Sequence, residues 1–334
     1  MKKSSLHTTV STILSCVIGA GFVSGKEIAI FFENSIWGAI LFALALTLAL
    51  ITLSNFCNKN NVTSIVDFSQ KTFGKGGYVY LWFVSLAMFF VVVALFSTTK
   101  DCITSLVGCN TKLPLYQGVI AVLCFFVAKV GKHAIEKTTK ILLPICLIFI
   151  VLAHVFTTKS VVTTSQFNVK GSLIYCFFNF VPLTCLLSKN KATKPSVVVA
   201  VVTLGAVVLL QIVTTSANSQ ANLPTLVAVS SSKLLTIFGI VAILVSAITG
   251  ILLCSMPVWE FLDHLLCDTS TCIGVTFALA VALSNFGFGK IVELCYPLIA
   301  TLGFATLVGV VTKGLKLMKI KRRMGKVTLA HPEK

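Results

Sequence analysis

Long runs without a charged side chain are the feature that most constrains this chain. Residues 36–56 and residues 78–99 each contain no Asp, Glu, Lys or Arg. About 20 apolar residues in a helix are enough to cross the ~30 Å hydrocarbon core of a bilayer. Across the chain, 56% of residues are hydrophobic and only 11% are charged, which is too little charge for the surface of a soluble protein of this length. We therefore predict an all-α, polytopic integral membrane protein in contact with the lipid bilayer.

The apolar runs and the charged or Gly/Asn/Pro-rich breaks between them predict about ten transmembrane helices. We treat residues 1–334 as a single membrane domain, with one five-helix half at about 8–157, a second at about 169–313, and a basic tail at 314–334. The predicted spans are 8–32, 36–56, 78–98, 115–130, 138–157, 169–188, 195–217, 233–258, 270–286 and 289–313.

The basic residues are distributed as expected for loops of a membrane protein. The formal net charge is +17, but the lysines and arginines lie in short loops and in the tail instead of on one face. We therefore exclude a nucleic-acid partner. Most of them fall on the side that holds both termini, and basic loops stay on the inner side of a membrane. This predicts a multi-pass protein of the cell membrane with cytoplasmic N- and C-termini.

The first predicted span carries a glycine-rich interruption at mid-depth. Gly19, Gly21 and Gly25 lie within seven residues, directly before Lys26 and Glu27, and each glycine weakens a helix by roughly 1 kcal/mol relative to alanine. A break at membrane depth persists only where it lines a protein cavity and its free backbone groups find partners. The pattern equally fits close packing of a neighbouring helix on Gly21 and Gly25, so both interpretations stay open.

The sixth span carries a second interruption at the matching place of the second half. It contains Tyr175, Asn179 and Pro182. Proline removes a backbone donor, and a mid-membrane amide needs a partner. Alone, this pattern slightly favours an ordinary proline kink. Interruptions at equivalent places of two halves, however, indicate inverted repeats with a binding site between them.

Three stretches resemble one family of bacterial membrane proteins. Residues 17–32 (VIGAGFVSGKEIAIFF), 173–180 (LIYCFFNF) and 293–304 (ELCYPLIATLGF) are similar to the first, sixth and tenth helices of the YkvI-like family, within the amino acid–polyamine–organocation (APC) superfamily. The resemblance implies a LeuT-type fold of two inverted five-helix repeats with broken helices 1 and 6. It also implies alternating access and transport of a small solute driven by Na⁺ or H⁺. The family usually has Gln where this chain has Lys26.

The resemblance also implies a set of site residues. The solute would be held by the broken helix 1 together with helix 6, and a Na⁺ ion by carbonyls of helix 1 with hydroxyls of helix 8. Solute-binding candidates are Ala20, Gly21, Ser24, Gly25, Tyr175, Phe178 and Asn179; Na⁺ candidates are Cys16, Gly19, Ser246 and Thr249. The two hydroxyls fit equally well a structural role, bonded back to carbonyls one turn earlier in their own helix.

Glu27 is the candidate coupling group, with Lys26 beside it. An acid inside the membrane is costly and indicates function, because it can take up and release a proton or be held ionised by Lys26. The alternative is a structural Lys26–Glu27 pair reaching water at the outer end of the helix. Four polar residues, Gln211, Thr214, Thr215 and Asn218, are expected where the outer end of the seventh span emerges into water.

These observations favour a secondary active transporter of a small polar or zwitterionic, amino-acid-like solute. No nucleophile, metal-binding or paired-acid motif indicates an enzyme, and we expect no cofactor beyond Na⁺ or H⁺ as the coupling ion. The rival interpretation is a receptor or sensor that uses the transporter fold without transporting. The sequence leaves the identity of the solute, the direction of transport and the oligomeric state open.

Overall fold

The computed structural model describes residues 6–107, 114–157, 167–188, 192–266 and 268–330. All regular elements in these ranges are helices. Seven are long and apolar enough to cross a membrane, and shorter apolar helices supply the other spans. The long helices are α4 (Ile36–Lys59), α6 (Gly77–Val107), α8 (Lys132–Phe156), α9 (Val169–Leu187), α10 (Lys194–Thr215), α12 (Lys233–Leu266) and α14 (Phe288–Ala330).

Three further segments complete the predicted set of spans. The fourth and ninth spans are α7 (Leu115–Val130) and α13 (Thr269–Leu283), and η3 (Ser284–Phe286) follows α13. The first span consists of α1 (Leu6–Val17), α2 (Ala20–Val23) and α3 (Lys26–Phe32). Each of the ten predicted spans therefore coincides with a helix or a helix series in the described part of the chain.

Side-chain caps explain where several helices begin. The hydroxyl of Ser35 accepts from the Gly38 N–H at the start of α4, and a capping box formed with Thr193 opens α10. Such caps satisfy donors that have no partner within the helix. Asp268 caps α13 by accepting from the hydroxyl and the N–H of Thr271, and these two hydrogen bonds lower the pKa of this loop carboxyl.

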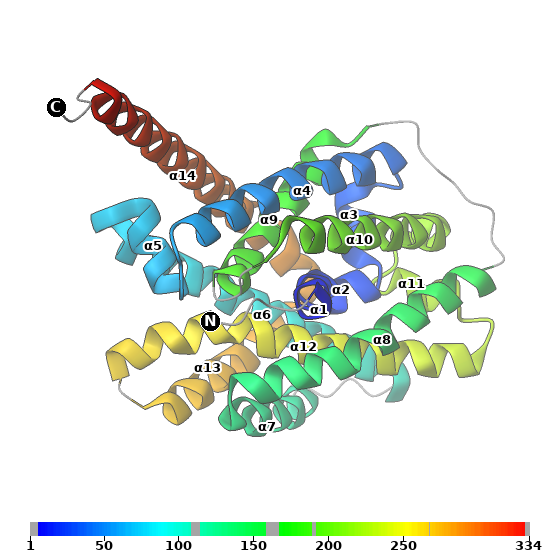
Figure 1. The fold of residues 1–334 in the computed structure, drawn as a ribbon. Coiled ribbons are helices and arrows are strands. Elements are labelled where there is room, and N and C mark those ends of the chain that lie inside the picture. The colour runs from blue at the N-terminus through cyan, green and yellow to red at the C-terminus, as the bar shows by residue number, and fades with distance from the viewer. Residues whose placement is uncertain (1–5, 108–113, 158–166, 189–191, 267, 331–334) are drawn as a thin grey trace.

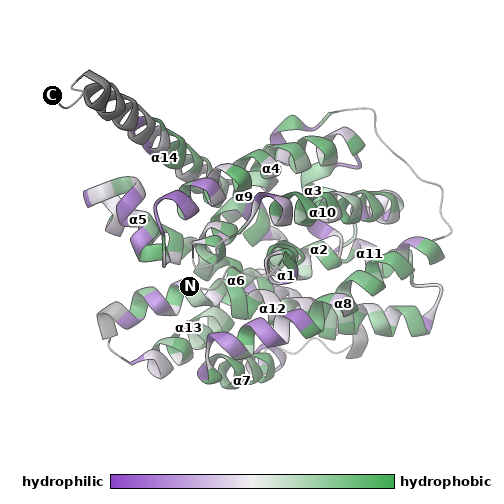
Figure 2. Cartoon of the chain, in the orientation of Figure 1, coloured by the Kyte–Doolittle hydropathy of each residue, from purple (hydrophilic) through white to green (hydrophobic). Residues whose placement is uncertain are grey.

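The spans pack around the first helix. α1 contacts α8, α9, α10 and α12, and Figure 1 shows it end-on at the centre of the molecule. α12 packs along α6 and α8, while α9 packs against both α4 and α14. Most of the ribbon in Figure 2 is green, the colour of hydrophobic residues, and many large apolar side chains are exposed on the bundle, as expected for contact with lipid. Exposed examples are Trp37, Leu48, Phe126, Val202 and Leu298.

Two glycines bring the backbone of α9 against its neighbours. A Cβ at Gly303 of α14 would overlap the main-chain carbonyl of Phe177 in α9, and a Cβ at Gly171 of α9 would overlap the carbonyl of Phe31 in α3. Small residues allow such close approach between membrane helices. The position of α9 is therefore set by backbone contacts on two sides.

Helix 6 is not broken, contrary to the prediction. α9 runs without interruption from Val169 to Leu187, with Pro182 inside it. A proline removes a single backbone donor, and the remaining turns of α9 have no glycine except Gly171 near its start. The amide of Asn179 donates back to the Tyr175 carbonyl at 2.9 Å, which satisfies it within the helix. The loss of one hydrogen bond is insufficient to unwind the chain here.

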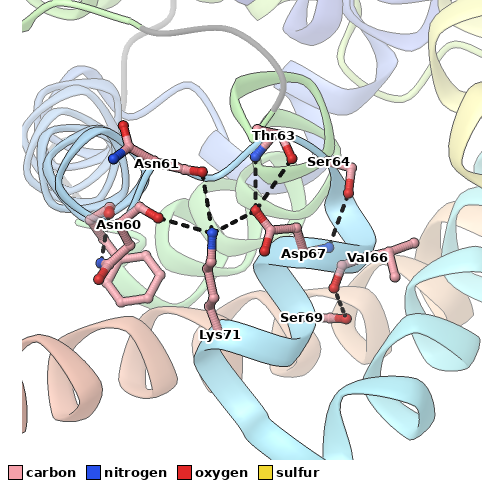
Figure 3. Close-up of polar contacts among 9 residues, drawn as sticks. Asn60, Asn61, Thr63, Ser64, Val66, Asp67, Ser69 and Lys71 are labelled. Carbon is pink, nitrogen blue, oxygen red and sulfur yellow. Dashed lines mark hydrogen bonds and ion pairs between the residues drawn. The ribbon is translucent and has the colours of Figure 1, made fainter.

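A short polar helix follows α4 at one end of the bundle (Figures 1 and 2). This helix, α5 (Ile65–Phe73), is joined to α6 by η1 (Gly74–Gly76). Figure 3 shows how Lys71 ties it to the end of α4: its ammonium donates to the carbonyls of Asn60 and Asn61 at 2.9 and 3.2 Å. It also pairs with Asp67 at 2.8 Å. Lysine at the carbonyl end of a helix stabilises its last turn.

A second connecting segment lies at the opposite end of the bundle. Between α10 and α12 the chain forms η2 (Ser216–Asn218) and α11 (Pro224–Ala228). Figure 1 shows α11 at the end of the molecule away from α5. The segment predicted as a tail continues α14 as a helix to Ala330, and this extension projects away from the bundle in Figure 1.

Candidate functional site

Helix 1 is interrupted twice near the middle of its length. α1 ends at Val17, and α2 ends at Val23 before α3 begins at Lys26. At the first break Gly19 is extended (φ −85°, ψ −178°). At the second, Gly25 has φ +79°, a left-handed conformation that favours glycine. The interruption predicted from the glycine pattern is therefore confirmed.

The carbonyls released by the second break are bonded by a side chain of α10 and by the main chain of α11. The amide nitrogen of Gln211 donates to the carbonyls of Phe22 and Val23, both at 3.2 Å. The amide oxygen of Gln211 accepts from the Thr225 hydroxyl at 3.1 Å, and the Thr225 N–H donates to the Ser24 carbonyl at 3.0 Å. The break thus survives in an apolar setting because its backbone groups have partners.

The outer end of the seventh span was expected to emerge into water, and this is wrong for three of its polar residues. Gln211, Thr214 and Thr215 are all buried. The reason is that α11 folds back over this part of α10, so that Thr225 meets both Gln211 and helix 1.

Glu27 lies in the first turn of α3 and is buried, with 5% of its surface exposed. Its two carboxylate oxygens accept from two hydroxyls, that of Tyr175 on α9 at 2.9 Å and that of Tyr296 on α14 at 2.8 Å. Gly21 faces the carboxylate so closely that a Cβ there would overlap it. One acidic group therefore connects helix 1 (through α3), helix 6 (α9) and helix 10 (α14) inside the membrane bundle.

Lys26 does not pair with Glu27. Its ammonium donates to the Ala221 carbonyl at 3.1 Å, between η2 and α11. The residues that the structure describes place no Lys, Arg or His in an ion pair with Glu27. The expectation of a Lys26–Glu27 pair reaching water is wrong, because the two side chains leave α3 toward different partners.

Four aromatic rings form a closed circuit beside the carboxylate. The ring centroids of Phe31 and Tyr175 are 5.4 Å apart, and those of Tyr175 and Phe178 are 6.3 Å apart. Tyr296 closes the circuit at 3.7 Å from Phe178 and 6.0 Å from Phe31. All four rings are buried. We call these residues the aromatic circuit.

The structure brings only some of the predicted solute-binding residues together. Gly21, Tyr175 and Phe178 gather around Glu27 or in the aromatic circuit. Ala20 and Ser24 are buried in the broken segment itself, where the Ser24 hydroxyl donates to the Gly21 carbonyl at 3.0 Å. Gly25 faces Thr215 and Thr225, and Asn179 is bonded within α9, so neither is placed by these contacts at the carboxylate.

The candidate Na⁺ ligands lie on helices that touch, since α12 packs against α1 and α2. The hydroxyls of Ser246 and Thr249 are buried. Each donates to a carbonyl three residues earlier, at 2.9 Å, which is the structural role left open by the sequence. The Gly19 carbonyl accepts from the Val23 N–H at 3.0 Å, and Cys16 is buried nearby in α1. Hydroxyl and carbonyl oxygens of this kind are the ligands that hard cations prefer.

Several residues of the site were missed by sequence reasoning. Tyr296 lies in the tenth-helix stretch that carried the resemblance, but it was not assigned to the site. Phe31 lies in the first-helix stretch that carried the resemblance, and it was likewise not assigned to the site. Gln211 was predicted to lie where the seventh span emerges into water, and Thr225 lies outside the predicted spans. A polar amide within an apolar run, as at Gln211, was the available signal for a buried hydrogen-bonding role.

Comparisons with known proteins place the fold. No protein-family model matches the chain, and no curated protein matches it. A solved structure of MhsT in complex with L-phenylalanine is similar, with a TM-score of 0.70 at 14% identity over 92% of this chain and 89% of MhsT. A Na⁺-coupled sialic acid symporter has a TM-score of 0.65 at 12% identity, over 92% of this chain and 78% of the symporter.

A third solved structure agrees with these two. Mhp1, a nucleobase-cation-symport-1 family transporter in a closed conformation with bromovinylhydantoin bound, has a TM-score of 0.61 at 14% identity over 85% of this chain and 74% of Mhp1. At such low identities the similarity shows the fold alone. The chain is therefore a polytopic membrane protein with the LeuT fold, as predicted.

Proposed function

We propose that this protein is a secondary active transporter of a small polar or zwitterionic, amino-acid-like solute that works by alternating access. The observation that carries the proposal is Glu27, a buried acid at the break of helix 1 that is bonded to helices 6 and 10. Ionisable groups inside a membrane bundle are costly and mark substrate or ion pathways. Broken helices at mid-membrane are the usual place for such sites in transporters.

The structural neighbours support this class of function. MhsT was solved in complex with L-phenylalanine and Mhp1 with bromovinylhydantoin bound, and the third neighbour is a Na⁺-coupled symporter of sialic acid. We extend these properties to the present chain as part of the proposal, together with membership of the YkvI-like family, inverted repeats at 8–157 and 169–313, and cytoplasmic termini.

Two coupling routes fit the residues of the site. Glu27 can exchange a proton when its hydrogen bonds to Tyr175 and Tyr296 change. Alternatively, Na⁺ can bind to the hydroxyls of Ser246 and Thr249 with carbonyls near Cys16 and Gly19. In either route we assign Lys26 to holding the outer loop over helix 1 through Ala221, rather than to neutralising Glu27.

Uptake into proteoliposomes with a Na⁺ gradient and a pH gradient imposed separately tests the proposal. We expect uptake of at least one amino acid from a labelled mixture under one gradient, and its loss in Glu27→Gln. Ser246→Ala separates the routes, because it should weaken uptake driven by Na⁺ and leave uptake driven by protons. The matched control is Glu136→Gln, a carboxylate paired with Lys132 at 3.7 Å away from the site. Solute binding without counterflow would instead identify a receptor.

A further inference from the structure

A cavity lies between α4 and α14 at the end of the bundle where α5 is found (Figure 1). At this end Gly309 of α14 is in close contact with Phe73 of α5. The cavity has a volume of about 400 Å³, which is within the usual range of ligand pockets. Its two sides are formed by Thr52, Asn55 and Lys59 of α4 and by Val310, Val311 and Leu315 of α14. It therefore combines polar and basic groups from one helix with an apolar wall from the other.

One face of α4 changes from apolar to basic as it reaches this cavity. Leu44 and Leu48 are exposed, and Thr52, Asn55 and Lys59 follow them at spacings of four, three and four residues. Residues three or four apart lie on the same face of a helix. Exposed leucines suit the hydrocarbon of a bilayer, whereas a lysine near a helix end places its ammonium among the headgroups. This face therefore passes from hydrocarbon to headgroup region at the cavity.

α14 shows the same change on the face that carries Val311 and Leu315. Phe304, Val308, Val311 and Leu315 are exposed apolar residues spaced three or four apart. The helix continues to Ala330, and position 322, an arginine, lies seven residues beyond Leu315, about two turns further along this face. Residues 313–326 include seven Lys or Arg and no Asp or Glu. Both helices thus present apolar groups first and basic groups beyond them, which is the order of acyl chains and phosphate in a phospholipid.

The charges around the cavity favour an anion. Lys59 lies in the last turn of α4 and forms no ion pair within the described part of the chain. Asp67, the acidic residue of α5, is already paired with Lys71 at 2.8 Å. Among the described residues that line the cavity there is no Asp or Glu. A zwitterionic headgroup would add its own cation to this basic region, so charge complementarity favours a headgroup with a net negative charge.

We infer that this cavity binds an anionic phospholipid, with its acyl chains along the apolar faces of α4 and α14 and its phosphate at Lys59 and the basic extension of α14. The membrane is the source of the ligand, since a soluble phosphate compound has no chains for the apolar faces. In the proposed orientation the cavity faces the cytoplasmic leaflet, whose surface carries anionic lipids. The inference does not depend on the proposed transport function, because the cavity lies apart from Glu27 and its partners.

Equilibrium binding of fluorescent lipids to the purified full chain in a neutral detergent tests the inference. The probes are phosphatidylglycerol and phosphatidylcholine with the same labelled acyl chains, and glycerol 3-phosphate is the competitor that lacks chains. We expect phosphatidylglycerol to bind about tenfold more tightly than phosphatidylcholine, and this preference should decrease as the salt concentration rises. Glycerol 3-phosphate should not displace the bound lipid.

Variants localise the effect. Lys59→Gln and Arg322→Gln should each weaken the binding of phosphatidylglycerol roughly fivefold and leave that of phosphatidylcholine unchanged. Val311→Trp fills the cavity without changing any charge and should weaken the binding of both lipids. The matched control is Lys129→Gln, which removes another exposed lysine from the last turn of a membrane helix. That helix, α7, lies on the opposite side of the bundle from α4 in Figure 1, so the control should bind like the native chain.

Four results would each overturn the inference. These are equal binding of the two lipids by the native chain, equal losses in Lys59→Gln and Lys129→Gln, full affinity in a variant with both Lys59→Gln and Arg322→Gln, and displacement of the lipid by glycerol 3-phosphate. Equal losses in the two lysine variants would indicate a diffuse attraction to positive charge in place of a site. The comparison of the two lipids uses the native chain, so it stays decisive if a variant fails to fold.

Discussion

Replacing Gln211 with leucine tests whether side chains of α10 sustain the break in helix 1. Gln211 is fully buried, donates to the carbonyls of Phe22 and Val23, and accepts from the hydroxyl of Thr225. Leucine has a similar volume and offers no hydrogen bond. The substitution therefore removes the polar link between the break and α11 while it preserves most of the packing.

The expected cost follows from these contacts. The Phe22 carbonyl keeps the Gly25 N–H as a donor at 3.0 Å. The Val23 carbonyl, in contrast, loses the donor that Gln211 provides. A buried acceptor left without a partner costs about 1–3 kcal/mol, whereas single hydrogen bonds between membrane helices average about 0.6 kcal/mol. We expect Gln211→Leu to lower the free energy of unfolding by about 2 kcal/mol. Thr225→Val leaves the buried amide oxygen of Gln211 without its donor and should cost about 1 kcal/mol, at the low end of the same range.

The measurement is a double-mutant cycle on these two residues, with the free energy of unfolding taken from equilibrium SDS titration in mixed micelles. Because the two side chains share a hydrogen bond, the double variant should cost less than the sum of the single variants. If Gln211→Leu costs no more than Thr225→Val, or if the two effects simply add, the carbonyls of the break do not depend on this amide and the reasoning is wrong.

Three further substitutions test other parts of the structure. Gly303→Ala should lower the free energy of unfolding by about 1–3 kcal/mol because its Cβ meets the main chain of α9. The control, Gly314→Ala in the same helix, has open space around it and should be neutral or slightly stabilising. Equal effects of the two substitutions in the same SDS titration would contradict the close approach at Gly303. Gly25→Ala should destabilise by about 1 kcal/mol or more from its left-handed backbone alone, and a stabilised variant would argue against φ +79°. Tyr296→Phe keeps the ring but removes one hydroxyl from the carboxylate, so gradient-driven uptake should fall several-fold while the protein remains folded; unchanged uptake would separate helix 10 from the site.

Hydropathy was sufficient to predict the membrane helices because charge-free runs of this length have few alternatives in lipid. The break in helix 1 was also predictable, since Gly25 adopts the left-handed conformation for which glycine is suited. In contrast, α5 is short and polar, and α11 has only five residues, so neither produces the hydropathy signal of a membrane span. Their positions depend on contacts such as those of Lys71 and Thr225, which join segments that the sequence alone does not bring together.

The errors in the site have equally specific causes. Pro182 was given the weight of a helix break, although one missing donor is tolerated in a helix that is packed on both sides. Glu27 was correctly selected as an unusual intramembrane acid, but its partners were not. Tyr175 and Tyr296 come from distant parts of the chain, and only the packing of α9 against α14 brings their hydroxyls to one carboxylate. Neighbourhood in sequence favoured Lys26 instead, which turns away to Ala221.

The close contact at Gly303 fixes one point of α14, so a tilt of this helix about Gly303 would move Tyr296 relative to the Glu27 carboxylate. Tyr296 lies seven residues before Gly303 on α14, or about 10 Å along the axis at a rise of ~1.5 Å per residue. Rotation of α14 by about 5° around this pivot would shift Tyr296 by roughly 0.9 Å, enough to stretch its 2.8 Å bond to Glu27 beyond the ~3.0 Å that an O–H···O bond tolerates. A small tilt of one helix therefore changes the hydrogen bonding of Glu27, and by reciprocity a change in what Glu27 binds biases the tilt.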